Sequence, residues 1–194
     1  MPRLLTLLMC MLSGCASAAE VWVETGRHGE SFQIEATAEF DADLRLAWQV
    51  LTDYDHLARF IPGLRASRTV ERHRNGAVVE QKGEARLLFF AIPIEVKLAV
   101  EEFPYFRITS RAVAGNFRDM RNAYYLDISE GRVRLRYSGR MTPDFSVPPL
   151  IGTWMLRRNV EQQFGAMVDE ILRRSRAAAG QPYPPSRTGP RDER

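Results

Sequence analysis

Residues that commonly carry enzyme chemistry are scarce in this chain. Its three histidines are His28, His56 and His73, and no two have the i, i+4 spacing that would place two metal ligands on one helix face. The two cysteines, Cys10 and Cys15, both fall near the N-terminus. The sequence contains no nucleotide-binding, zinc-protease or serine-hydrolase motif. We therefore predict no metal site, no cofactor, no catalytic cysteine and no disulfide within the domain.

Another set of polar residues has a pattern that is typical of ligand binding. Side chains at every second position of a strand lie on the same face of the sheet. These residues fall at the same alternate positions as apolar neighbours along expected strands, so their side chains should face inward. They are Gln81, Ser110, Asn122, Tyr124 and Tyr137, with Arg68 on the parity of Leu64, Ala66 and Val70. Buried polar groups need partners, which leaves two interpretations. Either these groups bond to one another or to water, or they hold the polar head of a ligand in a mostly apolar cavity.

The element expected to face these groups is a long helix from Pro148 to Arg176. Proline fits the first turn of a helix, and no further proline occurs before Pro182. Apolar residues recur at helical spacing along one face of this segment. Four of them are expected to line the helix side of the cavity, although the same stripe also fits a plain core. They are Trp154, Met155, Phe164 and Met167.

The chain before this helix is expected to form an antiparallel sheet. A short run at Val21–Val23 and a polar turn at 25–30 precede a strand with clean alternation at 31–40. Two short helices follow before Pro62, and further alternating strands continue to Met141, with a tight hairpin at Asn75-Gly76. This order predicts an α+β fold. A curved antiparallel sheet of about seven strands would wrap around the long C-terminal helix.

Both ends of the chain are expected to lie outside the domain, which we place at residues 20–178. Residues 1–18 have the features of a bacterial secretory signal peptide: a positive start, a nine-residue apolar run and small residues after it. Leu12–Cys15 resembles a lipobox, whereas Ala16–Ala18 fits ordinary cleavage before Ala19, and both interpretations stay open. Residues 179–194 are rich in proline, glycine and charge, and we predict a disordered tail. The protein is therefore expected in the periplasm or lipid-anchored in the cell envelope.

The order of elements resembles the helix-grip, or START-like (SRPBCC), superfamily. The run Ala47–Tyr54, continuing to Phe60–Gly63, is similar to its coenzyme-Q-binding and polyketide cyclase/dehydrase lipid-transport branch, and the likeness extends from about Phe32 to Arg176. The resemblance also places the family's later strands at Ser67-Arg68, Gln81-Lys82-Gly83 and Gly115-Asn116-Phe117. The resemblance implies a ligand cavity between helix and sheet, and no fixed catalytic set. The expected export of this protein differs from the cytoplasmic and mitochondrial location of members of that branch.

Two surface features suggest further contacts. The turn that contains Phe89, Phe90 and Ile92 could dock on a membrane, or could pack beneath the N-terminal hairpin. Outward arginines of the last strand form a basic face with Arg121 and Lys97, which is either solvated or suited to anionic lipid headgroups. A net charge of +3 and the lack of interleaved aromatic residues argue against nucleic acid as a partner.

These observations favour a non-enzymatic protein that binds or transports a hydrophobic small molecule. A lipid, a quinone or a polycyclic compound would fit between the sheet and the helix. The alternative is an enzyme of the cyclase, dehydratase or hydrolase type in the same cavity, although no Asp, Glu or His is expected at an inward position. A third hypothesis is an envelope protein whose core is filled and binds nothing.

Overall fold

The computed structural model of the chain describes residues 19–87, 90–147 and 149–180. The predicted signal peptide at 1–18 and residues 181–194 of the predicted tail lie outside the described residues. Within the described parts, no helix is long and apolar enough to cross a membrane.

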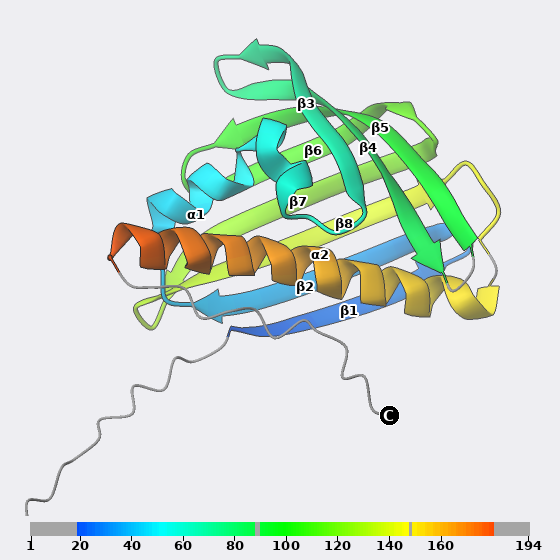
Figure 1. The fold of residues 1–194 in the computed structure, drawn as a ribbon. Coiled ribbons are helices and arrows are strands. Elements are labelled where there is room, and N and C mark those ends of the chain that lie inside the picture. The colour runs from blue at the N-terminus through cyan, green and yellow to red at the C-terminus, as the bar shows by residue number, and fades with distance from the viewer. Residues whose placement is uncertain (1–18, 88–89, 148, 181–194) are drawn as a thin grey trace, which may run out of the picture.

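Eight antiparallel strands form a single sheet in the order β1-β2-β8-β7-β6-β5-β4-β3 (Figure 1). The strands are β1 (Glu20–His28), β2 (Ser31–Phe40), β3 (Leu64–His73), β4 (Gly76–Leu87), β5 (Phe90–Phe103), β6 (Arg107–Gly115), β7 (Phe117–Ser129) and β8 (Arg132–Pro143). The helices are α1 (Leu44–Leu51), the short 3-10 helix η1 (Tyr54–Arg59) and α2 (Pro149–Ala178). The predicted α+β helix-grip architecture is confirmed.

The strand count differs from the prediction because the N-terminal hairpin is longer than expected. The segment predicted as a polar turn continues β1 to His28, which pairs with Ser31. β1 is an edge strand and buries only Val23, so polar side chains are tolerated along most of its length. The sheet therefore has eight strands instead of about seven. The long helix also extends two residues beyond the predicted end at Arg176.

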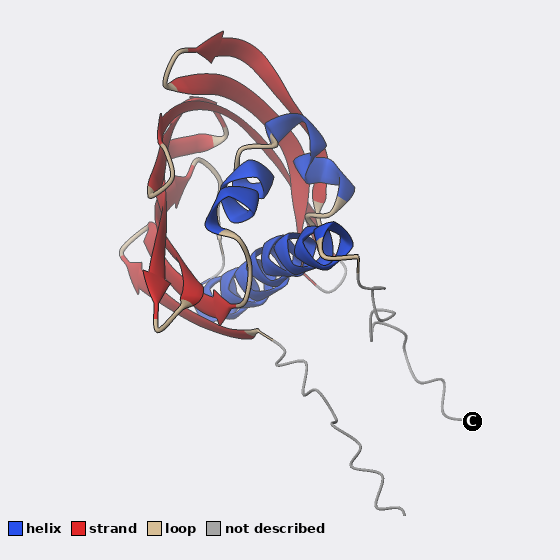
Figure 2. Cartoon of the chain, turned by 90° about the vertical axis from the view of Figure 1, so that its left-hand side faces the viewer, coloured by secondary structure: helices blue, strands red, loops and turns tan. Residues whose placement is uncertain are grey.

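The sheet curls around α2, and α1 and η1 lie on the same concave side (Figure 2). The helix contacts β1 and β2 near one edge of the sheet and β4 near the other. The two edge strands, β1 and β3, do not pair with each other. The helix therefore covers the open side of the curl and supplies one wall of the interior.

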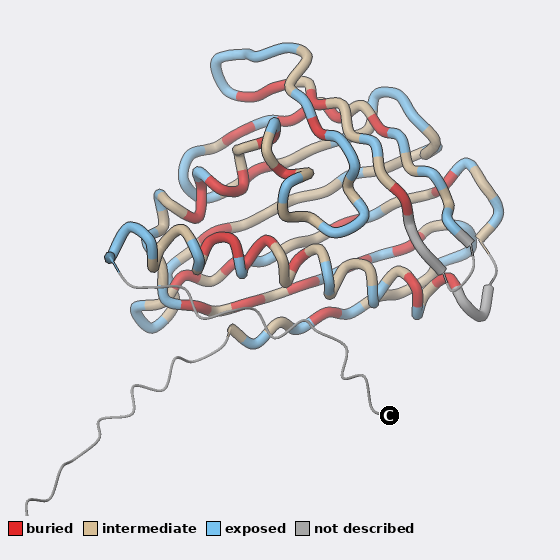
Figure 3. Tube along the Cα trace, in the orientation of Figure 1, coloured by how far each residue is buried: buried red, intermediate tan, exposed pale blue. Residues whose placement is uncertain are grey.

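Burial along α2 is uneven (Figure 3). In the half that ends at Ala178, Phe164, Met167, Val168 and Ile171 are buried and belong to the main hydrophobic core. In the half that begins at Pro149, Leu156 and Val160 are only partly buried. The C-terminal half is thus a core helix, whereas the N-terminal half borders less densely filled space.

A cluster of charged groups fixes the C-terminal half of α2 to the segment after α1. Arg174 donates from Nη2 to Asp53 at 2.9 Å and from Nε to Glu170 at 2.7 Å, and Asp53 also contacts His56 at 2.6 Å. Burial alone would raise the pKa of Asp53, but the hydrogen bonds from His56 and Arg174 and their charge lower it below its usual value. The carboxylate form is therefore favoured in the folded protein, and we call this cluster the Asp53–Arg174 latch.

Candidate functional site

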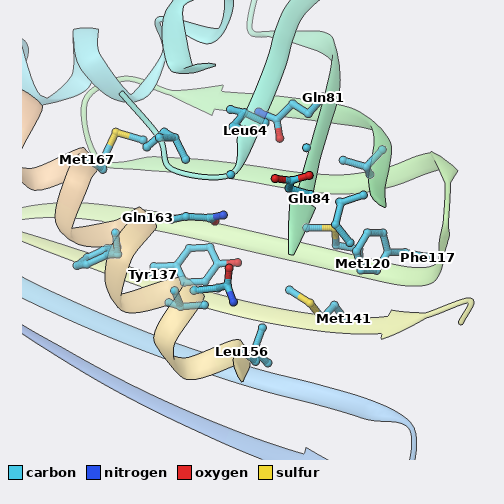
Figure 4. Close-up of a pocket in the computed structure, with 18 of the residues that line it drawn as sticks. Leu64, Gln81, Glu84, Phe117, Met120, Tyr137, Met141, Leu156, Gln163 and Met167 are labelled. Atoms are coloured by element: carbon cyan, nitrogen blue, oxygen red, sulfur yellow. The ribbon is translucent and has the colours of Figure 1, made fainter. Parts of the chain in front are cut away.

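A cavity of about 260 Å³ lies between the inner face of the sheet and the middle of α2 (Figure 4). From α2, it is lined by Leu156, Asn159, Val160, Gln163, Phe164 and Met167. From the sheet and the turn before β3, it is lined by Ile61, Gly63, Leu64, Gln81, Gly83, Glu84, Ile94, Val96, Phe117, Met120, Tyr124, Tyr137 and Met141. Most of these side chains are apolar, and a few polar groups are placed among them, which is the usual composition of a small-molecule site.

The cavity reaches the surface beside the turn that joins η1 to β3. A surface hollow shares Gly63, Leu64, Glu84 and Asn159 with the cavity and extends outward to Arg65. The turn is fixed to β4 by a backbone hydrogen bond of 2.8 Å from Glu84 N to Gly63 O. A Cβ on Gly83 would lie only 2.4 Å from that same oxygen, so this close approach requires glycine. One rim of the mouth is therefore made of backbone.

Two tyrosines form the polar part of the inner wall. The rings of Tyr124 and Tyr137 are 4.9 Å apart between centroids. The Tyr137 hydroxyl donates to Asn122 Oδ1 at 2.8 Å, and Asn122 Nδ2 donates to Ser110 Oγ at 3.4 Å. Among the described residues, none forms a hydrogen bond with the Tyr124 hydroxyl. This wall therefore presents one phenol group that is free to bond to a ligand.

Both phenols are protonated at neutral pH, as ordinary tyrosines are, and burial moves them further from ionisation. It raises the pKa of Tyr124 to about 12. Burial, with the neighbouring Tyr124 and Glu35, also raises the pKa of Tyr137 well above its ordinary value. A group with so high a pKa is a poor general base at neutral pH, but a dependable hydrogen-bond donor.

The remaining polar groups of the cavity lie nearer its mouth and already have partners. Gln163 Nε2 donates to Pro62 O at 3.2 Å, and Asn159 Nδ2 donates to the carbonyl of the preceding helical turn at 2.8 Å. Glu84 forms an ion pair with Arg65. Figure 4 shows Gln163 pointing from α2 and Glu84 from β4 toward the same space. The mouth is thus polar, whereas the inner wall is largely apolar.

Five of the ten predicted site residues line this cavity together. They are Gln81, Tyr124, Tyr137, Phe164 and Met167. Gln81 Nε2 also donates to Ser67 Oγ at 3.4 Å. Asn122 and Ser110 are not among the lining residues, but they support Tyr137 through the hydrogen bonds described above. The geometry of Asn122 and Ser110 therefore matches the first interpretation, in which inward polar groups bond to one another.

Three of the predicted site residues lie elsewhere. Arg68 points to the outer surface, where it pairs with Glu80 at 2.6 Å. Trp154 is 55% exposed on α2. Met155 is buried but does not line the cavity. Consecutive helical residues are separated by about 100° around the axis, so Trp154 and Met155 cannot both face one wall.

Several lining residues were not predicted as site residues. Met120, Met141, Ile94 and Val96 alternate with polar residues along their strands, which predicts an inward face but does not distinguish a cavity wall from a core. Asn159 and Gln163 lie at i and i+4 on α2, and this repeated amide spacing beside an apolar stripe is a signal that could have identified them. Glu84 follows the cavity-lining Gly83 and should face outward by strand alternation, yet it is 9% exposed at the mouth of the cavity.

The predicted membrane-contact turn stays a prediction. Phe89 lies outside the described residues, and the structure does not describe the side chain of Phe90. Ile92 is partly buried. Among the residues that the structure describes, no group of three or more His, Cys, Asp or Glu side chains could hold a metal ion.

Comparison with solved structures places this architecture among START-like proteins. Zhui aromatase/cyclase from Streptomyces sp. R1128 superimposes with a TM-score of 0.63 at 19% identity, covering 76% of this chain and 98% of that chain. A STAR-related lipid transfer protein from Xanthomonas axonopodis gives 0.62 at 13% identity, covering 81% and 95%. Human STARD10 gives 0.63 at 12% identity, covering 84% and 73%. At these identities, the likenesses show a shared fold.

A sequence comparison with curated proteins finds no match. The family model described as "Polyketide cyclase / dehydrase and lipid transport" matches residues 40–168, which is most of the folded domain. This match includes α1, η1, the strands from β3 to β8 and the part of α2 that lines the cavity. The chain therefore belongs to the polyketide cyclase/dehydrase and lipid transport family, within the START-like helix-grip superfamily.

Proposed function

We propose that the protein binds a hydrophobic small molecule in the cavity between the sheet and α2, and carries it in the cell envelope. One observation carries the proposal: an apolar cavity, open at one end, has a single unpartnered phenol hydroxyl on its inner wall. An unsatisfied donor in an apolar wall is a group that a ligand oxygen can satisfy. The ligand classes that fit are lipids, quinones and polycyclic compounds.

The geometry suggests how such a ligand would lie. Its apolar part would pack among Met120, Met141 and Phe164, and the Tyr124 hydroxyl would donate to an oxygen on it. Methionine side chains adapt their shape to different apolar ligands. A more polar end would remain at the mouth, near Gln163. The volume of about 260 Å³ suits a fused ring system or part of an acyl chain, so a longer ligand would extend through the mouth.

Turnover of the ligand is less well supported than binding. Glu84 is the one carboxylate among the cavity-lining residues, and it lies at the mouth in an ion pair with Arg65. The two phenols remain protonated near neutral pH. General acid–base catalysis needs a group whose pKa lies near the working pH. These features favour a binding protein over a cyclase or dehydratase.

Location in the envelope is part of the proposal and rests on residues 1–18. Mass spectrometry of the protein isolated from its own host would identify the mature N-terminus. An acylated Cys15 would establish a lipoprotein, and an unmodified start at Ala19 would establish release into the periplasm. A full-length protein that begins at Met1 in the cytosolic fraction would contradict export.

Native mass spectrometry of the protein, purified gently from its own host, tests the binding function. Extraction with organic solvent would identify any co-purified molecule. Val160→Trp should fill the cavity from the helix side and lower ligand occupancy at least about tenfold. Arg157→Trp places the same side chain on the exposed face of the helix, and should leave occupancy unchanged. Equal occupancy in both variants, or no ligand after addition of lipids and quinones, would overturn the proposal.

A further inference from the structure

The outer face of the sheet carries arginines that the cavity does not use. The predicted basic face of β8 is largely neutralised, because three of its arginines have acidic partners: Arg132 with Asp41, Arg134 with Glu39 and Arg136 with Asp127. Arg140, on the same strand, has no ion pair among the described residues. The charge that remains on this face is therefore concentrated at one end of β8.

Arg140 is the first member of a row that crosses three strands. The sheet register places Arg121 directly opposite Arg140, and Arg111 directly opposite Arg121. Their neighbours at the two ends of the row are uncharged, Gln33 on β2 and Ala99 on β5. All three arginines are exposed. The row has one acidic contact, from Asp119 to Arg121 at 3.2 Å.

The arginine row, Arg111, Arg121 and Arg140, borders a hollow of about 560 Å³ on this outer face. The adjacent row across the sheet consists of the small residues Ser138, Ala123 and Thr109, which leave the space unfilled. Glu35 and Glu101 end that adjacent row, each two strands from its centre. Glu35 is a diagonal neighbour of Arg140, and Glu101 is a diagonal neighbour of Arg111, so the acids border the two ends of the hollow while Arg121 and Ala123 face its middle.

The arginines of the row repel one another, and this repulsion is offset in part by Asp119 and by Glu35 and Glu101 at the border of the hollow. Like charges directly opposite on neighbouring strands destabilise a sheet, and strands are spaced by only about 4.8 Å. Guanidinium groups bind phosphate oxygens in a bidentate manner, and a dianion can neutralise two of them at once. We propose that the arginine row is a binding site for a phosphate monoester or a similar small dianion.

The shape of the hollow favours a single phosphate group over a nucleic acid. None of its lining residues is aromatic, so it offers no surface on which bases could stack. The floor at Ala99 and Ala123 leaves room for the carbon part of an ester. The site is separate from the cavity, and it can be tested without knowledge of the cavity ligand.

Titration of the full chain with inorganic phosphate and with glycerol phosphate, at fixed ionic strength, tests this site. Phosphorus NMR line broadening and the thermal midpoint would both report binding. Arg111→Gln combined with Arg140→Gln should weaken binding about tenfold or more, because two charged donors are lost. Arg134→Gln combined with Arg136→Gln removes the same charge from the same face, and should change binding less than about threefold.

A second measurement guards against a folding artefact. In the absence of phosphate, the Arg111/Arg140 variant should be no less stable than the wild-type protein, because the substitution relieves repulsion. A clear loss of stability, equal binding loss in the control variant, or the same response to chloride as to phosphate would overturn the proposal.

Vesicles distinguish the source of the phosphate. Flotation with phosphatidylcholine vesicles, with and without phosphatidic acid, would be compared for both variants. Binding that needs phosphatidic acid and the arginine row would identify a lipid headgroup as the ligand. Binding of soluble phosphate without vesicle binding would identify a free phosphate ester. Absence of both responses would contradict an anion site.

Discussion

The two halves of α2 belong to one continuous helix but meet different surroundings. The C-terminal half packs Val168 and Ile171 into the main core and is fixed to the segment after α1 by the Asp53–Arg174 latch. The N-terminal half lines the cavity with Leu156, Val160 and Gln163, and the lining continues to Phe164 and Met167 at the start of the C-terminal half. One half therefore stabilises the fold, whereas the other leaves space for a ligand.

This difference shows how a single amphipathic stripe can supply both a core and a binding wall. Apolar residues recur along the whole helix, but only the C-terminal half meets a closely packed partner surface. Opposite the N-terminal half, the sheet presents Gly83, the Tyr124–Tyr137 pair and two flexible methionines. The contrast thus comes from the sheet that each half faces, and mutations in the two halves should have different consequences.

Two valines, eight positions apart on the same helix, give the largest expected contrast. Val168→Ala removes methyl groups from a side chain that is 1% exposed, and should lower the free energy of unfolding by about 2 kcal/mol. Val160→Ala only enlarges an existing cavity, so its cost should be less than about 1 kcal/mol. Urea denaturation of both variants measures the difference. Equal losses would mean that the N-terminal half is packed as tightly as the core.

The latch should give a smaller effect that depends on pH. Arg174→Gln should cost about 1 kcal/mol at pH 7, because Asp53 and Glu170 lose a cationic partner. Both carboxyls have a pKa below the usual value in the folded protein. For Glu170, the hydrogen bond from Arg173 is the main cause. Their contribution is complete above the pKa of the unfolded chain, about 4, and is lost as the pH falls through the folded values.

The stability of the wild-type protein should therefore fall more steeply than that of Arg174→Gln between about pH 5 and pH 3. Denaturation midpoints across this range measure the slopes. Arg157→Gln is the matched control, because Arg157 and Glu161 form an exposed pair in the other half of the helix. That control should cost less than about 0.5 kcal/mol. Parallel slopes for wild type and Arg174→Gln would contradict the role of the latch.

The smallest effect on stability is expected at the wall opposite the N-terminal half. Tyr124→Phe removes one hydrogen-bond donor to the ligand, and should weaken binding by about threefold to tenfold with little change in stability. Tyr125→Phe is an adjacent control, since Tyr125 lies on the outer face beside Arg136. Ligand titration of both variants measures the two affinities for comparison with the wild-type protein. Unchanged affinity in Tyr124→Phe would show that the phenol does not contact the ligand.

Much of this architecture could be predicted from the sequence, because period-2 and period-3.6 patterns are physically strong. The alternation in β2 and the stripe of α2 each reflect burial on one side of an element. The extent of β1 could not be predicted, since an edge strand pairs on one side only and tolerates polar residues. The pattern of burial that identifies a strand is therefore weakest at the edge.

The position of Arg68 could not be inferred from parity for a different reason. The pairing of β3 with β4 shifts register between Leu64 and Ala66, and again between Thr69 and Glu71. Each bulge changes which residues share a face, so Arg68 lies outward although Leu64 lines the cavity. Ser67 faces Gln81 instead. Bulges leave no clear signature in a single sequence, and site predictions from parity fail where they occur.

The open sheet has a mechanical consequence for ligand size. Because β1 and β3 do not pair, no hydrogen bonds between these two edge strands close the sheet behind α2. Among the described residues, the N-terminal half is held by two side-chain hydrogen bonds, from Thr25 Oγ1 to Thr153 O at 3.5 Å and from Gln163 Nε2 to Pro62 O at 3.2 Å, whereas the other half is fixed by charges and core packing. The part of the helix around Ile171 is therefore held more firmly than the N-terminal half. Tilting of the N-terminal half would widen the cavity without breaking the hydrogen bonds between strands, at the cost of these two side-chain hydrogen bonds and of side-chain contacts.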